Sequence, residues 1–568
     1  MSRSPRRLDP VTFELIHEGL VAATREMGSV LKHASYSPII RDMDDFSCAL
    51  FTATGQLVAQ ADHIPAQLGA MSLVVASIRQ RWAGSVSDGD VFIANHPYLG
   101  AMHTPDINII QPVVHGGQVV AWSGTAAHHI DVGGVNPGTE GPDLGEVYAE
   151  GLLLPPVRLD HAGAEVPDVT AILAANVRDP LSTLSDLRAQ RAACRLGARR
   201  LLELVARHGL RQVTQAFADA IRFSDQATRA RLAELPDGTG VAEGFCDDDG
   251  RGGRPTRIHA VVAKTGDRLT VDLSGSAAQV AGALNVPWAS TRAAVVYAVR
   301  VMVRPDAAVN DGILGAVDIV CPLGSVLNPH FPAAVSVRHN TCQRLADTLI
   351  RAMSVIWPAR AVASSSVAFF ALNIGSRTPD GSRAAVLADV VGGGTGGHPR
   401  GDGLDGVDTY LSNVGLMPVE VVETSYCVRV TRTELIDGSQ GRGRHRGGMG
   451  LRRDYQILDR PQTVTYYVEQ TRQAFAPRGA AGGGPGRPSR VVRIDPEGRM
   501  VAIPSKATVT LPAGAVLRVE TSGGGGYGRG ARSRTATVPG DREDHSREER
   551  FGADRPSLAS VPSPRRSR

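Results

Sequence analysis

The chain has 568 residues, more than one ordinary domain, and its 42% hydrophobic and 21% charged residues are typical of a globular protein with a sizeable core. Ten arginines and six acidic residues between 529 and 568 account for the whole net charge of +4, which argues against a broad nucleic-acid surface on residues 1–528. No CxxC pair and no run of ~18 apolar residues occurs, so we expect a cytoplasmic protein that binds neither nucleic acid nor membrane.

The first predicted elements are a helix and a hairpin. Asp9-Pro10 is a helix start, and apolar residues at helical spacing continue the pattern to about residue 33. Residues 46–51 and 56–60 are β-prone and flank a Thr-Gly turn, which predicts a β-hairpin. Asp45 and His63 stand near its polar ends, and we interpret both as candidate substrate-binding residues.

The stretch from 95 to 134 gathers more metal-ligand and acid/base side chains than any other. It begins with a turn-rich loop that holds two further candidate substrate-binding residues, Asn95 and Tyr98. Two β-prone runs follow, 107–114 and 118–127, and they flank a His-Gly-Gly turn. These runs predict a hairpin in which residue 104 lies opposite residue 128 or 129, so that polar residues from both strands meet at its open end.

Two imidazoles and one carboxylate are the ligand set of zinc, iron and manganese sites with open positions. His103 and Asp106 can face one ion, and because adjacent strand residues point to opposite faces, only one of His128 and His129 should join them. The other histidine, or Asp131, would orient a ligand or transfer protons. The alternative is that these histidines form a polar turn layer satisfied by backbone carbonyls.

The rest of the chain predicts an α+β fold, a large mixed multi-domain arrangement of β-hairpins, sheets and an antiparallel helix pair. We expect an N-terminal α+β region over 1–180, a helical hairpin over 181–237, a mixed α/β and β-rich region over 238–528, and a disordered basic tail over 529–568. The glycine run 392–397 lacks the GKS or GKT ending of a P-loop, so we interpret it as a tight crossing or a substrate-lining loop.

Several long motifs in a fixed order carry a resemblance to a known family, the hydantoinase B/oxoprolinase family. It covers about residues 8 to 528, and the motifs are DFSCALFTATGQLVAQADHIPAQLGAM, GDVFIANHPYLGAMHTPDINII, AHHIDVGG, VVGGGTGGHPRGDGLDG and TSGGGGYG. The resemblance implies the large subunit of an ATP-dependent hydantoinase or 5-oxoprolinase, related to the alpha subunits of acetone carboxylase-type enzymes. Two positions depart from the family pattern, which usually has Asp where His96 stands and His where Gln67 stands.

By resemblance, the metal ligands fall on His103, Asp106 and His128, with Zn, Mn or Fe as the candidate ions. His129 and Asp131 are then the candidate catalytic residues. ATP would bind a partner similar to the hydantoinase A subunit, in a hetero-oligomer whose small-molecule substrate is a cyclic amide. Two alternatives stay open, an ATP-dependent acetone or acetophenone carboxylase-type alpha subunit and a non-catalytic scaffold subunit.

Overall fold

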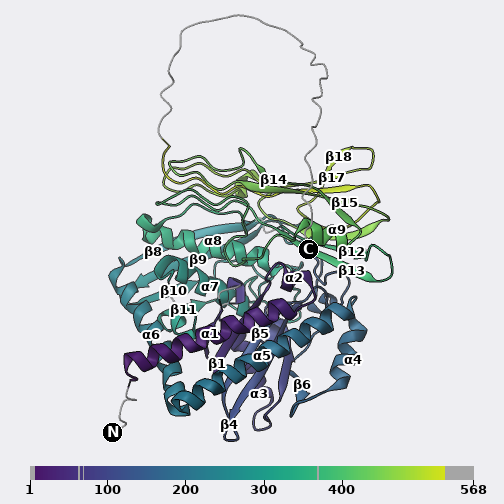
Figure 1. The fold of residues 1–568 in the computed structure, drawn as a ribbon. Helices are drawn as coiled ribbons and strands as arrows, with labels where there is room; N and C mark the ends of the chain where they lie inside the picture. Colours follow the sequence, from purple (N-terminus) through teal and green to yellow (C-terminus); the bar gives the residue numbers. More distant parts are fainter. Residues whose placement is uncertain (1–6, 62–63, 68, 307, 368–369, 531–568) are drawn as a thin grey trace, which may run out of the picture. The chain divides into compact units, whose positions relative to one another are not determined.

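One antiparallel sheet of seven strands organises the N-terminal part of the molecule (Figure 1). The computed structural model describes residues 7–61, 64–67, 69–306, 308–367 and 370–530. The strand order is β2-β1-β5-β4-β3-β6-β7. The strands are β1 (Phe46–Thr52), β2 (Leu57–Gln60), β3 (Val91–Ala94), β4 (Asp106–His115), β5 (Gln118–His128), β6 (Val157–His161) and β7 (Ala164–Glu165).

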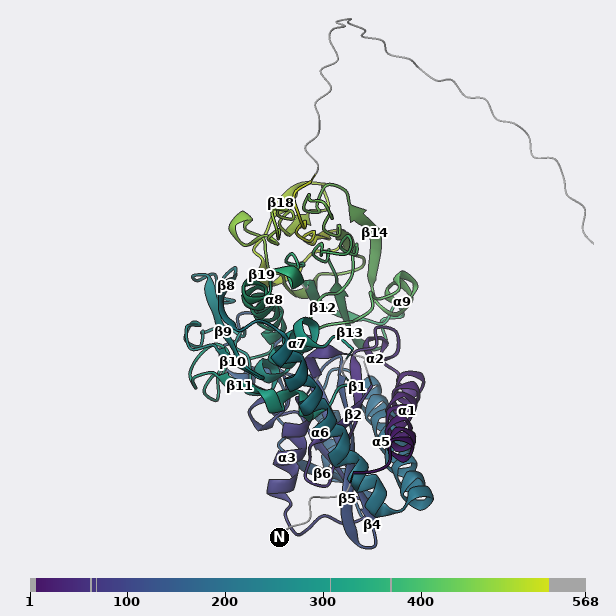
Figure 2. The same ribbon diagram turned by 90° about the vertical axis from the view of Figure 1, so that its left-hand side faces the viewer.

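Long helices cover one face of this sheet. The first is α1 (Pro10–Ala34), whose start is fixed because the Asp9 side chain accepts a hydrogen bond from the Thr12 backbone N–H at 3.0 Å. Its partner is α5 (Pro180–His208), which packs on α1, β4 and β5 and leads through Gly209 into α6 (Leu210–Glu234). Figure 2 shows the three helices side by side. The predicted first helix, both hairpins and both helices of the pair are therefore present.

A second sheet has four strands in the order β11-β10-β9-β8, and α8 packs on its β8 and β9 strands. The elements are β8 (Gly238–Cys246), β9 (Thr256–Thr265), β10 (Arg268–Asp272), β11 (Val317–Val320), α7 (Trp288–Val303) and α8 (Arg338–Ile356). The first two residues of α8 are Arg338 and His339, and both belong to the candidate site described below.

Two more sheets form the C-terminal part. One has the order β13-β12-β16-β19 and the other β14-β15-β20-β17-β18. Their strands are β12 (Phe370–Arg377), β13 (Ala384–Val391), β14 (Val428–Ile436), β15 (Gly450–Ile457), β16 (Gln462–Tyr467), β17 (Arg490–Ile494), β18 (Met500–Ala502), β19 (Lys506–Leu511) and β20 (Val516–Glu520). The shorter helices are α2 (Pro38–Arg41), α3 (Met71–Arg81), α4 (Pro167–Asn176) and α9 (Val419–Ser425). The fold is thus α+β, as predicted.

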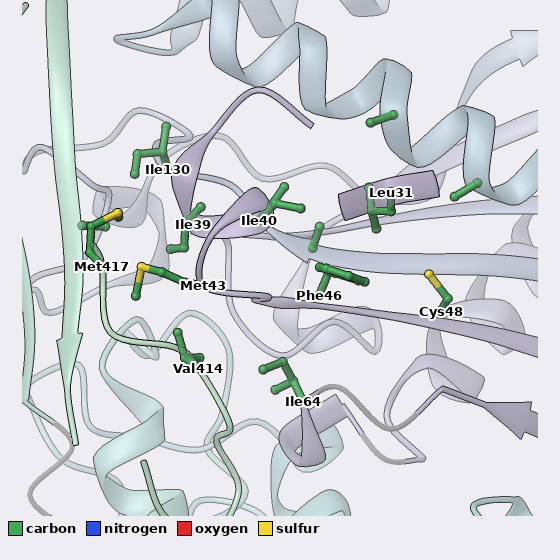
Figure 3. Packing of buried hydrophobic residues seen from close by; sticks show 14 of the residues in the cluster. Leu31, Ile39, Ile40, Met43, Phe46, Cys48, Ile64, Ile130, Val414 and Met417 are labelled. Carbon is green, nitrogen blue, oxygen red and sulfur yellow. The ribbon is translucent and has the colours of Figure 1, made fainter. Parts of the chain in front are cut away.

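The largest hydrophobic core joins the N-terminal sheet to these C-terminal segments. Figure 3 shows Leu31 of α1, Ile40 of α2 and Phe46 of β1 in one cluster with Val414 and Met417. Because residues almost 400 positions apart share this core, the described residues up to Gly530 form one compact unit. The boundaries proposed near 180 and 237 stay predictions, and residues 531–568 of the proposed tail lie outside the described residues. Among the described helices, none has both the length and the apolar character needed to span a bilayer.

The glycine-rich runs pack against one another through their backbones. Gly394 donates to Ser522 O, Gly448 donates to Thr395 O, and Gly524 donates to Gly448 O, with N···O distances of 2.8 to 3.1 Å. Segments from three parts of the sequence therefore approach as closely as backbone hydrogen bonds allow, and side chains would keep them apart. The run 392–397 is a tight crossing in this array.

We expect Gly448→Ala to destabilise the protein by about 2–3 kcal/mol, because overpacking forces neighbouring backbone to move. A Cβ on Gly448 would lie 1.7 Å from the Leu404 carbonyl oxygen. Gly484→Ala is the matched control, since a Cβ there would meet its nearest atom at 3.5 Å. Urea unfolding midpoints measure the difference, and equal midpoints for both variants would contradict the close packing.

Candidate metal centre

The hairpin of β4 and β5 brings the two polar clusters together at its open end. Asp106 pairs directly with His128, two positions further along β4 than the pairing predicted from the sequence. The turn consists of Gly116 and Gly117, both with positive φ, and a bulge shifts the register of the two strands between Val113 and Val114. The prediction that the clusters meet is confirmed, and the register error comes from the turn length and the bulge.

Three potential ligand atoms converge there. His103 Nε2 lies 3.1 Å and His128 Nδ1 lies 3.4 Å from the same carboxylate oxygen, Asp106 Oδ1. Bonds of about 2.0–2.2 Å to a tetrahedral ion separate neighbouring ligand atoms by roughly 3.3–3.5 Å, close to this spacing. All three side chains are buried, with at most 8% of the residue exposed.

Hydrogen bonds fix which nitrogen of His103 faces Asp106. The other ring nitrogen, Nδ1, is 3.2 Å from the Ser336 carbonyl oxygen, which only accepts, so Nδ1 carries the proton. The lone pair of Nε2 then points at the Asp106 carboxylate, an arrangement that a cation between them stabilises. A ring N–H bound to a carbonyl is also the usual support of a metal-ligating histidine. These donors fit a divalent ion.

Charges around the three residues favour the metal-binding forms of His103 and Asp106, whereas they favour the protonated form of His128. Burial lowers the pKa of His103, which favours the neutral imidazole that binds metals. Burial alone would raise the pKa of Asp106, but His103 and the Arg338 guanidinium, 2.9 Å from Oδ2, hold it well below its usual range. For His128, burial acts to lower the pKa, yet the hydrogen bond to Asp106 and the charge of Asp45 raise it to about 9.

Glu140, Tyr467 and His339 form a hydrogen-bonded chain beside the three potential ligands. The Tyr467 hydroxyl donates to Glu140 Oε2 at 2.6 Å, and its oxygen lies 2.5 Å from His339 Nε2. Asn373 also donates to Glu140 Oε2, at 3.0 Å. The other oxygen, Glu140 Oε1, is buried, has no hydrogen-bond partner among the described residues, and lies 3.6 Å from His103 Nδ1.

His103, Glu140 and His339 form a second group of potential ligands with atoms within 4.8 Å of one another. It shares His103 with the first group and would use a ring nitrogen that already faces Ser336 O. We therefore assign Glu140 to the support of His103 rather than to a separate ion.

These residues line a cavity in which the centres of water-sized molecules can occupy about 60 Å³. Asp45, also in its lining, has its carboxylate 4.0 Å from His128 Nδ1. Burial raises the pKa of Asp45 to about 7, which His128 partly counteracts. The structure thus places Asp45 beside the predicted ligands.

Two predicted catalytic residues lie elsewhere. Neither His129 nor Asp131 is among the described residues that line the cavity. His129 points to the opposite face of the strand, where its Nε2 meets Gln190 Oε1 of α5 at 2.9 Å. Asp131 accepts hydrogen bonds from Gly133 N and Gly138 N and from both the backbone and the side chain of Arg178. In this geometry both residues hold neighbouring groups in place, and their catalytic roles stay predictions.

Two of the predicted substrate-binding residues also hold loops in place. Asn95 donates to Thr104 O and accepts from Leu154 N, so it fixes the loop before β4. The Tyr98 hydroxyl donates to Ala333 O at 2.6 Å, outside the cavity lining. His63 lies outside the described residues.

The two departures from the family pattern differ in position. Gln67 lines the cavity, where it is buried and its Oε1 has no hydrogen-bond partner within the part of the chain that the structure describes. His96 lies outside the lining, where its Nδ1 accepts a hydrogen bond from Tyr98 N and its ring packs on Phe331.

Sequence reasoning missed the residues that come from distant segments. They are Glu140, Arg338, His339, Asn373 and Tyr467. Arg338 and His339 are neighbours, and the other three stand in separate segments; none belongs to a local metal or acid/base pattern, so no short-range signal identified them.

We expect Glu140→Gln to weaken metal binding by about 10–100-fold, the usual effect of removing a supporting group behind a metal-ligating histidine. The fold should survive because the amide keeps the shape of the side chain. Glu146→Gln, an exposed change nearby, is the control. Competition titrations with a chromophoric chelator measure both affinities. Unchanged affinity in Glu140→Gln would contradict the supporting role.

Comparison with known proteins agrees with this architecture. The B subunit of a putative D-/L-hydantoinase from Pseudomonas sp. (strain NS671) is 32% identical, covering 92% of this chain and 90% of the relative. The 5-oxoprolinase 1 of Arabidopsis thaliana is also 32% identical, over 92% of this chain but 42% of the plant protein. The crystal structure of ATP-dependent caprolactamase from Pseudomonas jessenii matches with a TM-score of 0.86 and 27% identity, covering 92% of both chains. Because the hydantoinase B/oxoprolinase model also matches residues 9–530, this chain belongs to the hydantoinase B/oxoprolinase family.

Proposed function

We propose that this chain is the ring-opening large subunit of an ATP-dependent cyclic-amide hydrolase of the hydantoinase/5-oxoprolinase type, working in the cytoplasm. The observation that carries the proposal is the convergence of His103, Asp106 and His128 in a buried, acid-lined cavity. Family membership and the likeness to a caprolactamase support the cyclic amide as substrate.

Because a planar amide resists attack by water, the proposed reaction begins by activating the amide with ATP. Transfer of the terminal phosphoryl group of ATP to the amide oxygen gives ADP and an activated carbon. Water adds to that carbon, the ring C–N bond breaks, and the nitrogen takes up a proton. A second water converts the resulting acyl phosphate to the carboxylate and inorganic phosphate.

Residues of this chain would position the reacting groups and transfer protons in these steps. A divalent ion held by His103, Asp106 and His128 would supply Lewis-acid chemistry when bound. Arg338 holds Asp106 in place from the far side of its carboxylate. The Asp45 carboxyl lies in the cavity and can accept a proton from attacking water at Oδ2. The Glu140–Tyr467–His339 chain orients His103 and borders the space for the ring.

The ATP site belongs, in this proposal, to a partner similar to the hydantoinase A subunit, in a hetero-oligomer. One relative is named as the B subunit of its enzyme, and the chain matches less than half of the plant 5-oxoprolinase. Both facts support a division of the reaction between this region and another.

The test is turnover by the complex purified from its native cell. With ATP and a panel of hydantoin, 5-oxoproline and lactams, we expect phosphate release coupled to a ring-opened product detected by mass spectrometry. The chain alone should lack this activity. ATP- and bicarbonate-dependent carboxylation of a ketone, without ring opening, would favour the carboxylase alternative instead. Full activity of a His103→Ala complex would favour the scaffold alternative.

A further inference from the structure

We propose that the ring opened in this cavity is an uncharged cyclic amide, and that a ring with a free carboxylate is a poor substrate. This inference rests on the proposed function and deepens it. It selects among cyclic amides by charge, a choice that the relatives leave open because they include both a 5-oxoprolinase and a caprolactamase.

Part of the cavity lining is apolar. It includes five aliphatic side chains, all of them buried: Ile39, Ile64, Leu372, Leu411 and Val414. Figure 3 shows Ile39, Ile64 and Val414, which come from three separate segments. The methylene groups of a lactam, or an alkyl substituent on a hydantoin, would exchange water for these side chains on binding.

The charged part of the lining is rich in carboxylates. Asp45, Asp106, Glu140 and Asp389 all line the cavity and all are shielded from solvent to a large degree. A carboxylate on the substrate ring would be brought out of water beside Asp106 and whichever of the other carboxyl groups are ionised, and both the desolvation and this repulsion oppose its binding.

The arginine of the lining is already engaged. Arg338 Nη2 donates to Asp106 Oδ2 at 2.9 Å, and Arg338 Nε donates to the Met102 carbonyl oxygen at 3.2 Å. Pairing with a substrate carboxylate would compete with Asp106 for this charge. Two other donors that line the cavity, Asn373 Nδ2 and the Tyr467 hydroxyl, already serve Glu140.

The experiment compares two rings that differ only in charge. The native complex with its ATP-binding partner is given 5-oxoproline or 5-oxoprolinamide, which share the same five-membered lactam. 2-Pyrrolidinone, the unsubstituted ring, serves as a second neutral substrate. We expect kcat/KM to favour the neutral rings over 5-oxoproline by about tenfold or more.

A substitution in the cavity lining tests whether this charge preference arises in this chain rather than in the partner subunit. Val414→Lys adds a cation to the apolar lining and should shift the ratio of kcat/KM toward 5-oxoproline by about tenfold. Val414→Met adds similar length without charge and should leave the ratio as in the wild type. Leu411→Lys and Leu411→Met provide the same comparison from another segment if the first pair does not fold.

The possible outcomes test the charge preference and the proposed function separately. Ring opening with equal or better kcat/KM for 5-oxoproline would overturn the charge preference and leave the proposed function standing. A lysine variant that folds, opens rings and keeps the wild-type ratio would also overturn it. Absence of ATP-coupled opening of every ring tested would overturn the proposed function, and this inference with it.

Discussion

Replacing His103 with alanine should remove the bound metal and abolish ring opening. His103 Nε2 is one of three ligand atoms, and its ring is fixed by Ser336 O on the other side, so alanine deletes a positioned ligand. We expect the metal affinity to fall by more than about 100-fold, beyond the effect of losing a supporting group. Turnover of the complex should fall on the order of 10³-fold. Elemental analysis and ATP-coupled product formation measure the two effects.

His115→Ala is the matched control for that experiment. His115 stands on the same strand as Asp106 but at the turn end of the hairpin, where it is exposed. Its loss should leave metal content and turnover unchanged. Equal metal content in the His103 and His115 variants would remove His103 from the ligand set.

Asp131→Ala should cost the protein about 3–5 kcal/mol of stability, because each buried N–H group left without its acceptor costs about 1–3 kcal/mol. The Asp131 carboxylate is fully buried and holds Arg178, Gly133 and Gly138. Alanine would leave three backbone N–H groups without their acceptor and the guanidinium without its counter-charge. Urea unfolding of the variant should therefore begin at a clearly lower concentration.

Asp143→Ala, an exposed change in the same segment, controls for the loss of a carboxylate and should unfold like the wild type. Turnover per folded molecule separates the supporting role of Asp131 from the catalytic role that the sequence suggested. A variant with wild-type stability but no turnover would support the catalytic role of Asp131 and contradict the supporting one.

Local patterns were enough to predict much of the fold. The Asp9 cap, the period of the first helix and the glycine turn at 116–117 each act within a few residues, so the sequence displays them directly. The glycine array was harder to predict because its hydrogen bonds join runs near 394, 448 and 524. Only the folded chain shows that these runs occupy one place.

The same distinction explains what was predicted of the site. His103, Asp106 and His128 lie on or beside one hairpin, and strand alternation predicted that only one of His128 and His129 faces the other two, while the resemblance pointed to His128. Arg338 and Tyr467 reach the site from elements more than 200 residues away, so spacing carries no information about them. The catalytic role of Asp131 stays a prediction, because a buried acid that holds a loop and a catalytic acid have the same sequence signal.

Anomalous diffraction from crystals of the purified complex tests the central claim most directly. At the absorption edge of the ion found by elemental analysis, we predict one strong peak within about 2.0–2.3 Å of His103 Nε2, Asp106 Oδ1 and His128 Nδ1. No peak there from a metal-replete complex, or a peak bound only by other residues, would contradict the account.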